Sequence, residues 1–364
     1  MNKKVLIIVT FICSFQYFQA QELPVNYLEN PENIDTNKPR NFFQKIGHFL
    51  NDIDTLYISP NQYKFAFMLE NSNWYEYYRL SDTQDIPQTL FISPKMNYKI
   101  GGYFGWKWIF VGYSIDVKNL FNKNTKNNRR TEFGLSLYSS VVGCDLYYRK
   151  SGSAFKLRNI EDFIPEDYTD PIKKDIDGFS VNIKGVNAYF ILNHKKFSYP
   201  AAYSQSTNQR RNAGSIIAGL SYSEHNLNFD KYKLPDYIYL LLDDAFNFKK
   251  INYKDFSLSV GYSYNWVFMK NCLANLSLTP AIAYKHAEID SKTMDYPVLN
   301  NFNFDLITRA GITYNNSKYF IGTSLVMHTY NYRSDYFNLN NSFGTIRIYA
   351  GFNFIKRKEY RTKD

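Results

Sequence analysis

The sequence lacks the long apolar segments that a helical membrane protein needs. Beyond its N-terminus, no part of the 364-residue chain reaches about 18 consecutive apolar residues, whereas a membrane-spanning helix needs about 20. The mean hydropathy of -0.43 would also suit a soluble protein. A helical-bundle membrane protein is therefore excluded, while a soluble fold and a β-barrel both remain open.

Cysteine and histidine are scarce and scattered along the chain. Cys13 lies in the N-terminal apolar run, so only Cys144 and Cys272 remain in the rest of the chain, and we expect no disulfide between them. The five histidines are widely separated: His48, His194, His225, His286 and His328. They form no i, i+2 or i, i+4 pair, and no loop has EF-hand spacing, so we expect neither a metal nor another cofactor.

The N-terminus has the pattern of a secretory signal peptide. Lys3 and Lys4 precede an apolar run of about eleven residues that ends at Phe15, and a cleavage site follows at Ala20. The run is too short to span a membrane as a helix. We therefore predict that residues 1–20 are removed and that the mature chain is exported.

The net charge of +10 suggests a polyanionic partner, but the basic residues do not gather on one element. Their densest run lies in a basic tail, residues 356–364, after the last predicted strand. Scattered basic residues that flank strands are typical of a solvated rim, so we exclude nucleic acid as a partner. Outer-membrane lipid and the phosphates of lipopolysaccharide are the anions that such a rim would meet.

Aromatic residues are abundant, and they alternate with polar ones. The chain contains 33 Tyr and 30 Phe, as expected for aromatic girdles at the two membrane interfaces of a barrel. The clearest alternation covers about fourteen residues, 255–268, whereas about 9–11 tilted residues cross a bilayer. A soluble sandwich would also alternate, but the signal peptide, strand length and aromatic content favour an apolar face toward lipid.

We predict an all-β fold over residues 55–355, an up-and-down antiparallel transmembrane barrel of about 12 strands (10–14). The predicted strands are 62–69, 89–103, 108–117, 131–138, 142–150, 179–192, 213–224, 255–268, 273–286, 303–314, 319–330 and 343–354. The connections on one side are long, as outer loops are. Those on the other side are short, as periplasmic turns are, except for residues 193–212.

Residues 21–54 form a segment ahead of the barrel, in which apolar residues have helical spacing. These residues are Phe42, Phe43, Ile46, Phe49, Leu50 and Ile53. The spacing predicts a short amphipathic helix near 40–53. Two interpretations stay open: a helix that covers the periplasmic mouth or lies on the inner leaflet, and a helix that docks a partner.

Several segments resemble one family. Residues 190–203 read FILNHKKFSYPAAY, residues 209–211 read QRR, and residues 213–215 read AGS. With DTLYI at 54–58 and GYSYN at 261–265, they resemble the signature of a Bacteroidota family, domain of unknown function 4421. The resemblance covers nearly all of the mature chain and implies an outer-membrane barrel, but it implies no biochemical role and no catalytic residue.

The signature falls on the long connection of the short-turn side, residues 193–212, which mixes basic and aromatic residues. The candidates there are His194, Lys195, Lys196, Phe197, Tyr199, Tyr203, Arg210 and Arg211. We predict that this loop plugs the periplasmic mouth and pairs its bases with lumen carboxylates such as Asp255 or Asp305. A gating or docking element, or a periplasmic hairpin with a strand at 197–205, are the alternatives.

The predicted lumen carries charges of both signs. They are Glu132, Asp145, Arg149, Lys184, Asp255, Asp305, Arg309 and Arg347. Paired charges would make a narrow barrel rigid, because an unpaired buried charge is costly, but the same residues would also line a small-solute pore.

Catalytic residues are not evident in this sequence. Ser223 and His225 share one strand face, yet they lack an evident oxyanion donor, and solvated rim residues explain them equally well. We therefore predict a non-enzymatic narrow channel or scaffold in the outer membrane, with a possible periplasmic protein partner. The alternative is an outer-membrane lipid-modifying enzyme of the lipase or acyltransferase class.

Overall fold

The computed structural model describes most of the chain between residues 52 and 361. The described residues are 52–83, 85, 87–94, 97–106, 109–116, 131–151, 155–161, 175–176, 178–234, 239–240, 242, 246–290, 299–333 and 337–361. The predicted signal peptide, and all but the last two residues of the predicted helix near 40–53, lie outside them. Within the described residues, no helix has the length and apolarity that crossing a bilayer requires.

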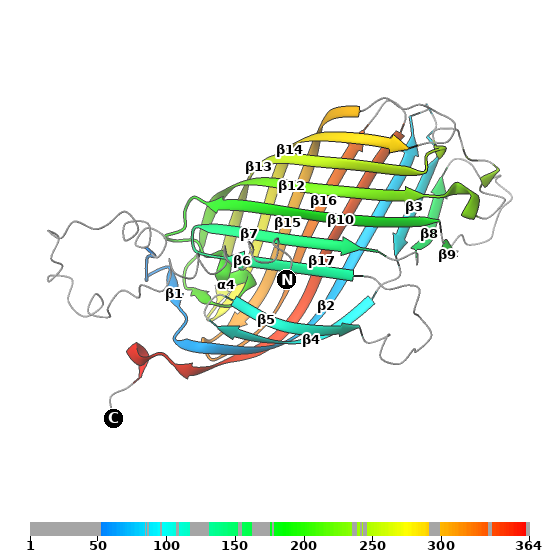
Figure 1. Cartoon of the computed structure of the whole chain (residues 1–364). Coiled ribbons are helices and arrows are strands. Elements are labelled where there is room, and N and C mark those ends of the chain that lie inside the picture. The colour runs from blue at the N-terminus through cyan, green and yellow to red at the C-terminus, as the bar shows by residue number, and fades with distance from the viewer. Residues whose placement is uncertain are drawn as a thin grey trace, which may run out of the picture.

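Twelve antiparallel strands form a curled sheet, the wall of the barrel (Figure 1). They are β2 (Tyr63–Asp82), β4 (Asn97–Trp106), β5 (Ile109–Asp116), β6 (Thr131–Tyr138), β7 (Val142–Lys150), β10 (Phe179–Ile191), β12 (Ala213–Phe229), β13 (Lys250–Met269), β14 (Cys272–Asp290), β15 (Leu299–Asn315), β16 (Tyr319–Arg333) and β17 (Phe337–Lys356). Wall strands pair in chain order, and β17 pairs with β2; in the described part of the chain, no pairing joins β5 to β6. The predicted barrel of about 12 strands is confirmed.

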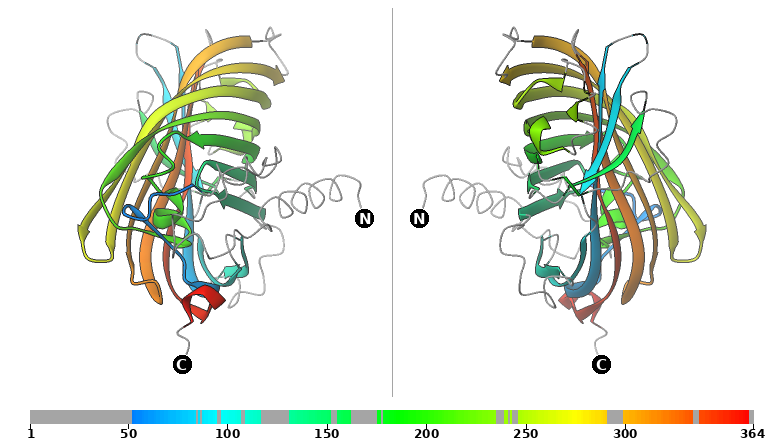
Figure 2. Two further views of the ribbon diagram at one scale, coloured as in Figure 1. Left: turned by 90° about the vertical axis from the view of Figure 1, so that its left-hand side faces the viewer. Right: turned by 90° about the vertical axis from the view of Figure 1, so that its right-hand side faces the viewer.

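The two ends of the barrel have different connections. At one end, the turn end, residues 270–271 join β13 to β14 and residues 316–318 join β15 to β16. Asn271 and Ser317 adopt positive φ angles of 65° and 74° there, as tight turns often require. The opposite end, the loop end, carries longer connections, such as residues 230–249 between β12 and β13. Figure 2 views the barrel from these two ends and shows the wall curling around its interior.

Three further strands extend the sheet at the loop end: β3 (Thr89–Pro94), β8 (Phe155–Glu161) and β9 (Asp175–Ile176). The predicted strand 89–103 is divided between β3 and β4, which both pair with β2. On its other side β4 pairs with β5, whereas β3 pairs with β8. The predicted outer loop 151–178 therefore adds two short strands to the wall at the loop end (Figure 1).

The long strands change their pattern near the loop end. In β13 the inward side chains are apolar at Ile251 and Tyr253 and, apart from Gly261, polar from Asp255 to Asn265. The outward side chains are polar up to Lys254 and apolar from Phe256 onward. Both faces change at one level, because an outward apolar face suits lipid, whereas beyond the membrane the apolar face must turn inward, away from water.

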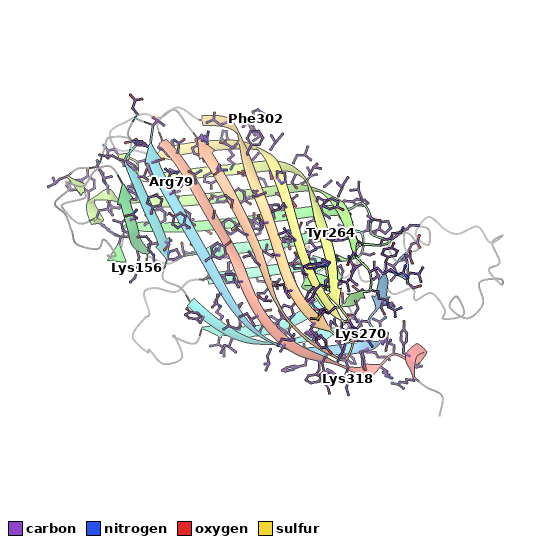
Figure 3. The ribbon with its side chains drawn as sticks, turned by 180° about the vertical axis from the view of Figure 1, so that it is seen from behind. Arg79, Lys156, Tyr264, Lys270, Phe302 and Lys318 are labelled. Atoms are coloured by element: carbon purple, nitrogen blue, oxygen red, sulfur yellow. The ribbon has the colours of Figure 1, made fainter. Side chains whose placement is uncertain are left out.

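The outer wall carries a belt of exposed apolar side chains between the level at which the strand pattern changes and the turn end. Phe302 is 76% exposed and Trp266 is 55% exposed, which a water-facing surface would not tolerate over a whole belt. Figure 3 labels Phe302 toward the loop end and Tyr264 toward the turn end of this belt. The belt is the surface that a transmembrane β-barrel presents to lipid.

Candidate functional site

Residues 193–212, here called the plug, fold into the turn end of the barrel. The plug contains the short helix α4 (Tyr199–Tyr203) and the strand β11 (Thr207–Gln209). The strand β11 pairs with β1 (Ile58–Pro60), which lies at the turn end (Figure 1). The side chain of Ser198 accepts a hydrogen bond from the Ala201 N–H and so begins α4. The sequence-based alternative of a strand across 197–205 is wrong, because α4 occupies that stretch.

The aromatic residues of the plug point into the barrel. Phe197, Tyr199 and Tyr203 are 0%, 1% and 5% exposed. The Tyr199 hydroxyl lies 2.6 Å from the Ser277 hydroxyl, and the Tyr203 hydroxyl donates to the Asn275 amide oxygen, both on β14. Buried hydroxyls of this kind are expensive to leave unpaired, so these contacts fix the depth of the plug.

Gln205 holds the plug to two further strands of the wall. It follows α4 with a positive φ of 56°, and its side-chain amide donates to the Tyr349 hydroxyl at 2.9 Å. Its amide oxygen accepts hydrogen bonds from Thr313 and Asn315 at 3.1 and 3.0 Å. One buried side chain therefore ties the plug to both β15 and β17.

The basic residues of the plug stay outside the lumen. Lys195 pairs with Asp52 at 2.5 Å. Lys196 and Arg211 lie against the Tyr57 ring, at 5.1 and 5.8 Å from its centroid. The prediction that they would pair with lumen carboxylates is wrong: moving several cations into the interior would cost their hydration, and bases on the wall already pair with the buried acids. His194, by contrast, is buried.

Two lumen carboxylates share one ammonium group near the level at which the strand pattern changes. Lys285 is 0% exposed, and its Nζ lies 2.8 Å from Asp305 Oδ1 and 3.1 Å from Asp255 Oδ2. The contact with Asp305 has hydrogen-bond geometry, whereas the contact with Asp255 is an ion pair only. Asp305 also accepts the Asn331 N–H at 3.0 Å. The three residues come from the neighbouring strands β13, β14 and β15.

Two arginines pair with acids from distant strands. Arg309 on β15 contacts Asp145 on β7 at 2.7 Å. Its guanidinium also lies 4.7 Å from the centroid of the Tyr189 ring. Arg149 pairs with Glu76 on β2 and stacks over Trp74 at 4.4 Å. These pairs cross the interior, so they hold opposite parts of the wall together.

The remaining predicted lumen charges have different positions. Glu132 pairs with Lys99. Arg347 is half-buried and lies opposite the buried Ser72. Lys184, however, is exposed and pairs with Glu224 at 2.7 Å on the outer surface, so its assignment to the lumen is wrong. It lies beyond the level at which the strand pattern changes, where outward positions face water.

Three buried or half-buried partners were not predicted. Lys285 lies on the inward face according to the two-residue alternation of the predicted strand 273–286, so that alternation could have predicted it as a lumen charge. Lys99 lies within the predicted strand 89–103. Glu76 was missed because β2 continues from Tyr63 to Asp82, whereas the predicted strand stopped at residue 69.

Aromatic contacts cross the interior toward the loop end. The hydroxyls of Tyr147 on β7 and Tyr330 on β16 lie 2.9 Å apart. The rings of Tyr78 on β2 and Phe179 on β10 have centroids 5.3 Å apart. Because these strands lie on opposite sides of the wall, their contact fills the interior at this level.

An apolar core, here the loop-end core, continues from these contacts to the loop end. Its fully buried members include Leu80, Leu90, Ile92, Phe155, Leu157, Phe179, Phe246, Ile251 and Phe337. They come from the wall, from β3 and β8, and from the connection before β13. The loop end is therefore packed like the core of a soluble domain.

The Ser223–His225 pair lies inside this packed interior. The Ser223 hydroxyl and His225 Nε2 are 2.9 Å apart, with exposures of 0% and 2%, so the solvated-rim interpretation is wrong. The His225 ring stacks on Tyr253 at 4.3 Å. Among the described residues, His225 Nδ1 has no hydrogen-bond partner, so the group that orients the base in a hydrolytic triad is not found.

The described part of the chain shows no group of three or more potential metal ligands. Its two cysteines, Cys144 and Cys272, are unbonded.

A family model matches residues 52–354, which include the wall, the plug and β1. The chain belongs to the family named domain of unknown function DUF4421. The resemblance found in the sequence is thereby confirmed. No curated protein matches the chain.

Several solved outer-membrane proteins are weakly similar to this chain. The outer membrane protease OmpT from Escherichia coli is 9% identical with a TM-score of 0.38, over 81% of this chain and 98% of that chain. The translocator domain of the autotransporter NalP from Neisseria meningitidis is 8% identical with a TM-score of 0.31, over 80% and 88%. The outer membrane protein OprG from Pseudomonas aeruginosa is 8% identical with a TM-score of 0.26, over 81% and 98%. Likeness this weak says nothing about function.

Proposed function

We propose that this DUF4421 protein is a closed outer-membrane β-barrel that serves as a non-enzymatic scaffold. The observation that carries the proposal is the series of contacts across the interior. The plug fills the turn end, Arg309–Asp145 and Arg149–Glu76 cross the middle, and aromatic rings fill the loop end. A solute pore would need a continuous open path; the plug and the aromatic rings obstruct it at the two ends, and the ion pairs narrow its polar middle.

The orientation of the barrel follows from its connections. Bacterial barrels have short periplasmic turns and long extracellular loops. With this rule the plug faces the periplasm and the loop-end core faces the cell exterior. The predicted signal peptide supplies the export that this orientation needs.

Planar-bilayer conductance of the full mature chain tests the proposal. We expect no discrete conductance steps, because both ends of the lumen are filled. Steps whose ion preference changes on Arg309→Glu would instead show that ions pass the central charges, and would replace the scaffold with a channel. Fold is checked by far-ultraviolet circular dichroism of the same samples.

The hydrogen-bonded Ser223–His225 pair keeps a lipid hydrolase as the second candidate. Phospholipid turnover by the purified protein tests it, with Ser223→Ala against Ser221→Ala as the matched control. Ser221 is also buried on the same strand and donates to the Asn187 amide oxygen. Turnover lost only in Ser223→Ala would support the hydrolase, whereas absence of turnover in the wild type would exclude it.

A further inference from the structure

Three cations of the plug lie exposed at the turn end. Together with Tyr57, we call them the basic cap. They are Lys196, Arg210 and Arg211. In the described part of the chain, none of the three forms an ion pair with a carboxylate. Of the nearby acids, Asp52 pairs with Lys195 and Asp54 accepts the Leu56 N–H. Among the described residues, the cap therefore presents three exposed cations that are not paired with a carboxylate.

The cap is held in place by a buried side chain. Gln209 is 7% exposed, and its amide nitrogen donates to the backbone carbonyls of Lys196, Arg211 and Tyr57 at 2.7, 2.9 and 3.3 Å. Its amide oxygen accepts from the Ser198 N–H at 3.0 Å. Two of the three cation-bearing positions are thus tied through one residue to each other and to Tyr57, which directly precedes β1.

The cap side chains are also restrained beyond the backbone. Lys196 and Arg211 both lie against the Tyr57 ring, and the Arg210 guanidinium donates to the Ser59 hydroxyl at 3.2 Å. Cations that are already ordered lose less side-chain entropy when they bind an anion. A solvated basic surface would need no such arrangement.

A second group of cations at the turn end, here the rim, has a different setting. Lys270, Lys318 and Lys356 lie in or beside the turns and strand ends, next to the outward apolar belt. Figure 3 labels Lys270 and Lys318 at this end of the wall. Side chains in such places reach the phosphates of the adjoining lipid leaflet. The cap instead lies on β1 and the plug, over the mouth of the barrel.

We propose that the basic cap is a docking surface for an acidic polypeptide segment of a periplasmic protein. The inference rests on the scaffold role and on the periplasmic orientation of the turn end. Lysine and arginine side chains held beside one ring, as Lys196 and Arg211 are, suit carboxylates that follow one another in an extended acidic segment. The position over the mouth favours a protein over lipid, because the rim, rather than the cap, adjoins the apolar belt.

Binding of a fluorescent glutamate-rich peptide to the full mature chain in nanodiscs tests the proposal. We expect saturable binding that weakens as salt rises, since exposed charges are screened. The cap variant Lys196→Glu/Arg210→Glu/Arg211→Glu should weaken binding at least tenfold. The rim variant Lys270→Glu/Lys318→Glu/Lys356→Glu changes net charge equally and should leave binding within about twofold, because its effect is only long-range.

A further variant tests whether the ordering of the cap cations contributes to binding in addition to their charge. Tyr57→Leu keeps every cap charge but removes the ring that orders Lys196 and Arg211, so we expect binding to weaken about threefold. Unfolding curves of all variants must match the wild type for these comparisons to count.

Two results would overturn the inference. Equal weakening by the cap and rim variants would show that net charge alone attracts the peptide. Binding of phosphatidylglycerol vesicles that needs the cap, with no peptide binding, would assign the surface to lipid phosphate. Failure of the scaffold role is separately visible, because it would appear as conductance with peptide binding intact.

Discussion

The turn end and the loop end of this barrel are closed in different ways. At the turn end a single connection folds inward and is held by tyrosine hydroxyls and amides, such as Tyr199 with Ser277 and Gln205 with Thr313. At the loop end the strands themselves continue beyond the membrane and pack apolar side chains such as Phe155 and Phe179 against one another. The first closure is directional and polar, and the second is apolar.

The difference follows from what the wall offers at each end. The plug enters the membrane-spanning part of the barrel, where inward positions are polar, so it must satisfy hydrogen-bonding groups. The loop-end core lies where the outer face meets water, so the inward face is free to be apolar. Each closure therefore matches the inward surface that the strand pattern provides.

The largest expected effect comes from removing both closures. Because they lie in series, deletion of residues 195–211 alone, or of the loop 151–178 alone, should leave the barrel non-conducting in planar bilayers. The double deletion should conduct once Tyr147→Ala and Tyr330→Ala also remove the aromatic contact that the wall itself makes across the interior. Conductance after the plug deletion alone would show that the loop-end core is not a seal, and circular dichroism must show an intact β-fold in every variant.

A smaller effect separates the interior from the outer surface. Lys285→Met leaves Asp255 and Asp305 buried without their cation, and should lower the free energy of unfolding by about 3–5 kcal/mol. Lys184→Met breaks an exposed pair with Glu224 and should cost at most about 1 kcal/mol. Urea unfolding in lipid vesicles measures both. Equal losses would contradict the assignment of Lys285 to the interior and Lys184 to the surface.

The smallest effect tests the polar and apolar closures directly by removing single hydroxyls. Tyr199→Phe loses the hydrogen bond to Ser277 and should cost about 1 kcal/mol. Tyr332 is equally buried at the loop end, yet its hydroxyl has no hydrogen-bond partner among the described residues, so Tyr332→Phe should be neutral or slightly stabilising. The same unfolding assay compares them. A greater loss at Tyr332 would contradict the comparison of the two ends.

Much of the barrel was predictable from the sequence because the membrane imposes a local rule. Lipid requires an apolar outward face and the strand period is two, so residues 255–268 revealed their two faces without any tertiary information. The same rule predicted the number of strands and placed Asp145, Asp255, Asp305 and Arg309 on inward faces. The prediction that residues 193–212 would plug the mouth came from an exception to the length rule for periplasmic turns.

The rule failed where the solvent changed. Beyond the membrane the outer face meets water, so the inward face becomes apolar and the outward face polar. The predicted strands were therefore too short at the loop end. For example, β17 begins at Phe337, whereas the predicted strand begins at residue 343. Lys184 was assigned to the lumen for the same reason. The side chains still alternate with a period of two, but the apolar ones point inward there and the polar ones outward.

The sequence by itself determined the local alternation, and with it the barrel and the side of the wall on which most charges lie. Only the tertiary structure decided which charges meet. Arg309 finds Asp145 across the interior, and Lys285 rather than a plug residue neutralises Asp255 and Asp305. Such choices depend on the curl of the wall and the depth of the plug, because ion pairs form between residues that are close in space, whatever their separation along the chain.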